Sequence, residues 1–235
     1  MRKALALAGL VCLSAIGAEA ADKKPVLAVW EFTNSTHAGW WYSGVGGDLA
    51  DMLTNELAST EKFKLVERKQ LGAVLGEQDL VLAGAVKKSG AAKVGKMTGA
   101  QYLVTGVVSA YEENVASTGG GVGFRGIGVG GKKEEAYIAI DLRVVDTTTG
   151  EVSFTRSVEA RAGSKGLSVG VNRGGISGGF GKMEKTPAGK AIRACLIEAS
   201  DYLSCVMVDK GGCEAEYAAK EKARREKTKG KVKLE

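Results

Sequence analysis

The early part of the chain alternates between apolar runs and amphipathic stretches. Val26–Phe32 (VLAVWEF) has the composition of a buried strand, and Asp48–Ala58 places leucine and methionine at helical spacing. Phe63–Val66 predicts a second short strand, and Arg68–Leu80 predicts a helix. The apolar residues along one side of that helix are Leu71, Val74, Leu75 and Leu80. Strands that alternate with helices predict a mixed α/β fold.

The middle of the chain predicts a hairpin. Ala91–Met97 predicts a short helix, and Tyr102–Tyr111 a third, longer strand. Apolar and polar residues then alternate along Ala136–Val145, a pattern typical of a strand buried mainly on one face. Thr147–Gly150 is expected to turn this strand back into Glu151–Val158.

Two helices are predicted to end the chain. Thr186 is a candidate N-cap before Pro187, a residue that the first turn of a helix tolerates, and this helix should reach Val208. Its apolar stripe is Ile192, Cys195, Leu196, Ala199 and Leu203. A second, strongly charged helix is expected over Cys213–Lys227.

Two glycine-rich segments, Gly119–Gly131 and Gly163–Gly181, flank the predicted hairpin. Glycine weakens ordinary strands and helices, so these segments are expected to serve something other than the core. Short period-two alternations within them fit membrane strands with one lipid-facing side, but surface loops also fit. The candidate membrane-facing residues are Val122, Phe124, Ile127, Val129, Leu167, Val169 and Val171.

The N-terminus predicts export. Arg2 and Lys3 precede the apolar run Ala4–Ile16, and Ala18–Ala20 has the small-x-small form of a cleavage site. Lipidation at Cys12 is not expected, because Val11 stands where a small residue is needed. No later stretch has the roughly 20 apolar residues of a spanning helix. The expected organisation is a signal peptide (1–20), one domain (21–212) and a basic C-terminal helix (213–235).

Three cysteines follow the predicted cleavage site. Cys195 and Cys205 are about 15 Å apart on a continuous helix, too far for a disulfide, whereas a turn at Gly211–Gly212 brings Cys205 to Cys213. The alternative is three buried, unbridged thiols.

The formal net charge of +6 is concentrated in the tail, which lacks interleaved aromatics. A solvated helix or contact with an anionic surface is therefore expected, and nucleic acid is not an expected partner.

Enzyme chemistry has little support in the sequence. His37 is the only histidine, so no metal site is expected. Gly121–Gly126 matches a dinucleotide-binding pattern, but it does not lead from a strand into a helix, and we expect no cofactor. The polar loop Thr33–Ser43 contains Trp40, Trp41 and Tyr42, which suit either a pore constriction or a hydrophobic lid over the first helix.

Several segments together resemble the curli secretion channel (CsgG) family. They are VLAVWEFTN, FKLVERKQLGAVLGEQDLVLAG, GAQYLVTGVVSAYEENV, the glycine-rich run leading into AYIAIDLRVVDTTTGEV, and TPAGKAIRACLIEASDYL. The resemblance implies a periplasmic α/β domain in a homo-oligomeric ring, whose subunits each give two hairpins to a shared outer-membrane β-barrel. It assigns those hairpins to residues 113–135 and 155–185, and the constriction to the loop after the first strand.

The sequence thus favours a curli-type channel that exports unfolded, amyloid-type subunits with accessory factors and without a nucleotide. The alternative is a soluble periplasmic scaffold or binding module of the same family in cell-envelope assembly. Cargo and subunit count stay open.

Overall fold

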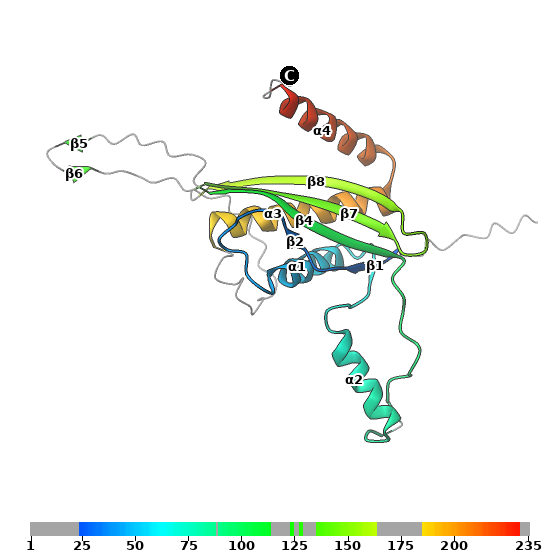
Figure 1. Ribbon diagram of the computed structural model, residues 1–235. Helices are drawn as coiled ribbons and strands as arrows, with labels where there is room; N and C mark the ends of the chain where they lie inside the picture. The colour runs from blue at the N-terminus through cyan, green and yellow to red at the C-terminus, as the bar shows by residue number, and fades with distance from the viewer. Residues whose placement is uncertain are drawn as a thin grey trace, which may run out of the picture.

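One mixed sheet organises the chain (Figure 1). The computed structural model describes residues 24–87, 89–113, 123–124, 127–128, 135–163 and 185–230, so the expected signal peptide lies outside the described residues. The strands are β1 (Val26–Val29), β2 (Thr33–Asn34), β3 (Lys64–Leu65), β4 (Tyr102–Glu113), β5 (Gly123–Phe124), β6 (Ile127–Gly128), β7 (Glu135–Asp146) and β8 (Val152–Gly163). The helices are α1 (Val45–Ser59), α2 (Leu71–Leu82), α3 (Pro187–Ser204), the π-helical turn η2 (Cys205–Asp209) and α4 (Gly212–Lys229).

The sheet has the order β3-β1-β4-β7-β8, with β2 also paired to β4. β1, β2 and β3 make parallel pairs, whereas β4, β7 and β8 form an antiparallel meander. α1 and α3 pack on one face of the sheet (Figure 1). The prediction of a mixed α/β domain is confirmed.

The core lies between this face and the two helices. β7 buries alternate residues, as its sequence pattern predicts, and each of these side chains is at most 2% exposed: Ile138, Ile140, Leu142 and Val144. The predicted stripe of α3 is buried in the same cluster. At its start, the Thr186 side chain accepts a hydrogen bond from the Gly189 N–H at 3.1 Å, which confirms the predicted cap.

Three local predictions differ from the structure. Ala91–Met97 is not helical, because Gly90 and Gly95 adopt positive φ values of 87° and 73° that interrupt a helix. The predicted loop after the first strand begins with β2, which pairs Thr33 and Asn34 with β4. The first strand ends at Val29, before the predicted end at Phe32.

Phe32 explains that early end. The Phe32 N–H donates to the Gly46 carbonyl of α1 at 3.1 Å, and the side chain is 1% exposed. A β-carbon on Gly46 would lie 2.1 Å from the Phe32 carbonyl oxygen, and one on Gly106 of β4 would lie 2.3 Å from the Phe32 ring. Phe32 therefore fits only between two positions that lack side chains.

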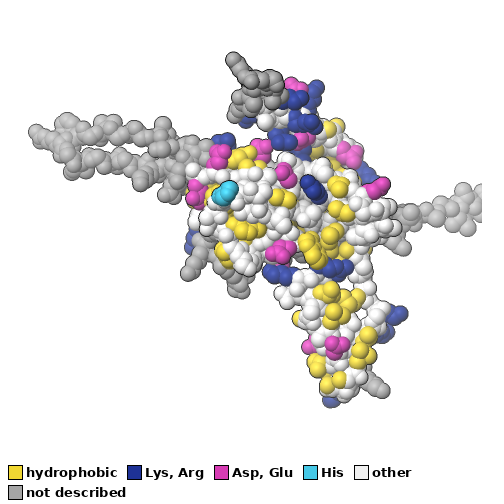
Figure 2. All heavy atoms as spheres, in the orientation of Figure 1, with side chains coloured by type: hydrophobic (Ala, Val, Ile, Leu, Met, Phe, Trp, Pro, Cys, Tyr) yellow, Lys and Arg dark blue, Asp and Glu magenta, His cyan; other side chains and the backbone are white. Residues whose placement is uncertain are grey.

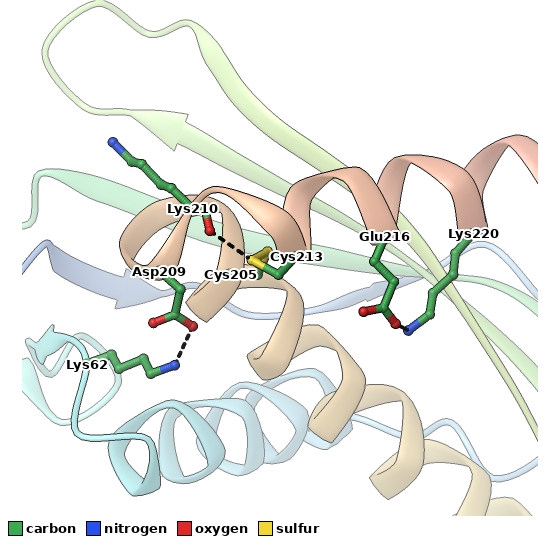
Figure 3. The surroundings of a disulfide bond; sticks show 7 residues. All are labelled: Lys62, Cys205, Asp209, Lys210, Cys213, Glu216 and Lys220. Carbon is green, nitrogen blue, oxygen red and sulfur yellow. Dashed lines mark hydrogen bonds and ion pairs between the residues drawn. A yellow bond between two sulfur atoms is a disulfide. The ribbon is translucent and has the colours of Figure 1, made fainter.

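Cys205 and Cys213 form a disulfide across the turn at Gly211, with their Cα atoms 6.0 Å apart (Figure 3). The third cysteine, Cys195, is buried, and its thiol lies 3.7 Å from the Val158 carbonyl oxygen. Burial raises the pKa of Cys195 to about 12, so its thiol is protonated at neutral pH. The pairing that the glycine turn favoured is thus present, and Cys195 is a core residue.

α4 leaves the body beside β8 and is largely exposed (Figure 1). Tyr217 is its one buried residue. The Arg156 guanidinium of β8 lies over the rings of Tyr202 and Tyr217 and donates to the Tyr217 carbonyl at 3.1 Å. Farther along, Arg224 pairs with Glu159 at 3.2 Å. The predicted charged helix is present, and it is anchored by the disulfide and by Tyr217.

The glycine fit around Phe32 gives the first prediction. Gly46→Ala should lower the free energy of unfolding by about 3 kcal/mol, because the new methyl group would overlap a backbone oxygen that cannot rotate away. Gly39→Ala, in the connection that precedes α1, is the control, since nothing lies within 4 Å of its added β-carbon. Chemical denaturation of both variants measures the difference, and equal stability would contradict the proposed fit.

Candidate functional site

The described residues that flank both glycine-rich segments lie at one end of the sheet. β4 ends and β7 begins there, with Glu113 opposite Ala136, and β8 ends beside β7, with Gly163 opposite Glu135. Figure 1 shows the start of α3 at this same end. The three longest strands and one helix therefore bring the residues that flank both glycine-rich segments to a single junction, and these two segments are called the extensions below.

The described part of the first extension contains a strand pair. β5 and β6 pair antiparallel, with Gly123 opposite Gly128 and Phe124 opposite Ile127. This pairing fits a hairpin within residues 113–135. The other candidate membrane-facing positions lie outside the described residues: Val122, Val129, Leu167, Val169 and Val171. Of the interval 155–185, residues 155–163 belong to β8 and pair with β7.

A β-bulge changes the direction of β4 shortly before the junction. Val108 pairs with Ile140 and Ala110 with Ala139, so Ser109 is an extra residue on β4. An extra residue of this kind bends a strand and increases its twist. The last residues of β4 therefore depart from the direction of the strand's first half, just before the first extension begins.

The connection between β2 and α1 is held against β4 near the bulge. Ser35 donates both its N–H and its hydroxyl to the Val108 carbonyl, at 3.0 and 3.1 Å. The Asn34 carboxamide oxygen accepts from the N–H and the hydroxyl of Thr36, at 2.9 and 2.7 Å. The short polar residues of this connection thus build local turns with their own side chains.

The aromatic residues of the connection have two different environments. Trp40 and Trp41 pack against the main core cluster, with their ring centroids 5.6 Å apart. Trp40 also meets Tyr111 of β4 edge to face, at 5.4 Å. Tyr42 is 45% exposed. The contacts of the two tryptophans fit the lid hypothesis, and Tyr42 is the member of the three presented to solvent.

Tyr111 and Glu113 belong to this site although the sequence analysis did not select them. The Tyr111 hydroxyl donates to the Glu113 carboxylate, and burial together with this carboxylate raises the pKa of Tyr111. The two residues are i and i+2 on one strand, so they share a face. That spacing was visible in the sequence, but its significance depended on where Trp40 packs.

The described residues offer no candidate metal centre. They contain no group of three or more His, Cys, Asp or Glu side chains placed to hold a metal ion. His37 is exposed on the connection. Among the described helices, none is both long and apolar enough to cross a membrane.

Comparison with known proteins identifies the family. The family model described as curli production assembly/transport component CsgG matches residues 8–232. The chain belongs to this family. The CsgG protein of Escherichia coli K12 is 33% identical over 105 residues, and that of Salmonella typhimurium gives the same values. The alignment covers 43% of this chain and only 38% of each relative.

Similar solved structures are more distant. A hypothetical protein from Chlamydia trachomatis is 15% identical, with 77% of this chain and 98% of the other covered and a TM-score of 0.40. The PelC dodecamer from Paraburkholderia phytofirmans is 12% identical, with 76% and 86% covered and a TM-score of 0.34. The family assignment therefore rests on the sequence comparisons.

The packing of the aromatic connection predicts separate effects for its members. Trp40→Ala and Trp41→Ala should each lower the free energy of unfolding by about 2 kcal/mol, roughly half the cost at a fully buried site. Tyr42→Ala should change it by less than about 0.5 kcal/mol, because this side chain is largely solvated. Urea denaturation followed by circular dichroism distinguishes them, and three equal effects would contradict the assignment.

Proposed function

We propose that this CsgG-family chain is a subunit of an outer-membrane secretion channel of the curli type. Its body lies in the periplasm, and a homo-oligomeric ring passes unfolded, amyloid-type subunits outward without nucleotide hydrolysis. Accessory factors deliver the cargo, and nucleic acid has no part in the process. Family membership supports the class of function.

The observation that carries the proposal is the shared junction at one end of the sheet. Two extensions that leave from a single edge can enter one membrane side by side, while the sheet and its helices stay on the periplasmic side. In lipid every backbone hydrogen bond must be satisfied within the protein, which strands achieve only in a closed barrel. Each subunit therefore contributes the parts of the intervals 113–135 and 155–185 that lie outside β4, β7 and β8 to a barrel that closes with the strands of its neighbours.

The constriction assigned to the connection after the first strand reduces to Tyr42 in this proposal. Trp40 and Trp41 hold the loop on the body through contacts with the core, and Trp40 also contacts Tyr111. Tyr42 carries the exposed ring. One ring from each subunit narrows the pore and offers apolar contact to a chain that slides past.

The alternative is a soluble periplasmic scaffold or binding module of the same family. Trp40 and Trp41 pack against the core, as residues of a hydrophobic lid over α1 would. This packing favours the scaffold, because such a lid has a structural role that does not require a pore. In that case the glycine-rich extensions contact a partner in water. The two experiments below separate the two functions.

The first experiment is cysteine scanning of the extensions in outer-membrane fractions, in a background with Cys195→Ala. Val122, Phe124, Leu167 and Val169 should react with a lipid-soluble maleimide. The intervening Gly123 and Ser168 should react with a membrane-impermeant one. Labelling at Lys64, an exposed body residue on β3, is the aqueous control. Uniform aqueous labelling of the extensions would overturn the channel and support the scaffold.

The second experiment measures single-channel conductance in planar bilayers. Tyr42→Ala should raise the conductance, since it removes one aromatic ring per subunit from the narrowest part of the pore. Tyr42→Phe should leave it unchanged, because the ring remains. Assembly of both variants is checked by detergent-resistant migration on gels. A conducting ring that is insensitive to Tyr42→Ala would place the constriction elsewhere.

A further inference from the structure

The segment of residues 70–100, here called the arm, projects from the body. It consists of α2 and the segment that returns to β4, and Figure 1 shows α2 directed away from α1 and from the sheet. Of the ten large hydrophobic side chains exposed in the described residues, seven lie in the arm. They are Val74, Leu75, Leu80, Leu82, Val86, Val94 and Met97.

Such a helix requires a partner. α2 has 12 residues, a length at which isolated helices are marginal in water. Its apolar residues surround the axis, and only Gln78 is buried. A helix that is apolar on all sides is typical of one enclosed by protein. The hydrophobic side chains visible over the projecting part of the molecule in Figure 2 therefore mark an interaction surface.

A groove of about 410 Å³ on the body has the complementary character. It lies where β1 and β3 end beside the first turns of α1, and Trp30, 54% exposed, forms part of its wall. Its charged lining residues are Glu31, Asp48, Asp51, Glu67, Arg68 and Lys69. Four acids and two bases give the lining a formal charge of −2.

The return segment of the arm carries the opposite charge. Residues 83–100 contain four lysines and no acidic residue. Among the described ones, Lys87, Lys93 and Lys96 are exposed and stand next to the exposed Val86, Val94 and Met97. An apolar, basic segment thus matches an acidic groove with an exposed tryptophan.

The arm is directed away from the groove of its own chain. The Glu67 carboxylate accepts hydrogen bonds from the N–H groups of Arg68, Lys69 and Gln70, at 2.8, 2.7 and 3.1 Å. Lys69 in turn pairs with Asp51 at 2.6 Å and lies 3.7 Å from Asp48. These contacts fix the point at which the arm leaves the body, at the wall of the groove.

We propose that the arm of each subunit docks in the groove of a second copy of this chain. Arm and groove are different surfaces, so the contact is head to tail, and contacts of this type close into rings when the rotation between copies allows it. The inference rests on the homo-oligomer of the proposed function and identifies the contact that joins its periplasmic bodies. Burial of the arm's apolar side chains supplies the affinity. The lysines of the arm lie opposite the acidic residues of the groove and fix the orientation of the docked arm.

Charge reversal tests the contact in the full-length protein. Lys93→Glu with Lys96→Glu should raise the protein concentration needed for half-assembly by about tenfold, because like charges then face each other. Adding Glu31→Lys to the double variant should return the concentration for half-assembly most of the way to its original value. The matched control is Lys222→Glu with Lys227→Glu, which makes the same change of net charge on exposed positions of α4. Size-exclusion chromatography with light scattering measures assembly, and circular dichroism checks the fold.

Photocrosslinking locates the docking site directly. A benzoylphenylalanine at Leu82 should crosslink to peptides that contain Trp30 or Asp51 of another chain. Mixed ¹⁴N and ¹⁵N subunits identify the inter-chain products by mass spectrometry. Crosslinks within one chain, crosslinks between two arms, or crosslinks only to other proteins would each overturn the inference.

The outcomes also separate this inference from the proposed function. An oligomer that crosslinks through arm and groove but fails to insert in membranes would refute the channel and leave the docking in place. A conducting ring whose assembly is unaffected by Lys93→Glu with Lys96→Glu would refute the docking alone.

Discussion

The insertion of Phe32 between two glycines sets the geometry on which the rest of the molecule depends. Its ring covers Gly106 in the middle of β4, and its backbone carbonyl meets Gly46 in the first turn of α1. One residue thereby connects the parallel half of the sheet, the first helix and the start of the antiparallel meander. A side chain at either glycine would separate these elements, because protein interiors have no spare volume for it.

Two surfaces on either side of Phe32 follow from this arrangement. After Phe32, the chain forms β2 and carries the aromatic connection along β4 toward the sheet's junction. Before Phe32, Trp30 stays at the wall of the acidic groove beside α1. The candidate pore loop and the candidate subunit contact therefore lie on the two sides of one fixed residue in the chain.

The sequence predicted regular elements well because their patterns are local. The alternation in β7, the stripe of α3 and the cap at Thr186 each depend on neighbouring residues, and all three are present. The failures depend on distant or absent partners. β2 exists only because β4 lies beside it, and the helix expected over Ala91–Met97 is lost to two glycines with positive φ. The sequence analysis placed the apolar residues of α2 along one side, whereas they surround the axis and Gln78 is the one buried residue of this helix.

In the candidate site, too, features set by neighbouring residues were predicted and features set by distant residues were not. The sequence singled out the aromatic cluster and the glycine-rich segments, but not that Trp40 packs on Tyr111 while Tyr42 is exposed. That distinction arises from the hydrogen bonds of Ser35 to β4, which link residues 73 positions apart. The disulfide was accessible from sequence because a turn of two glycines separates its partners by only eight positions.

The disulfide between Cys205 and Cys213 also affects the position of the positively charged helix α4. A loop of eight residues removes less entropy from the unfolded chain than a long loop would, and the bond also sets a direction. It fixes the angle at which α4 leaves α3, and with it the positions of Lys222, Arg225 and Lys229. In an oxidising compartment the disulfide holds the start of α4 against η2, and these exposed cations lie farther along the same helix. After reduction the helix is still held by Tyr217 and by two ion pairs with β8, Glu221 with Arg156 and Arg224 with Glu159, so the compartment's redox state affects how firmly these cations are placed.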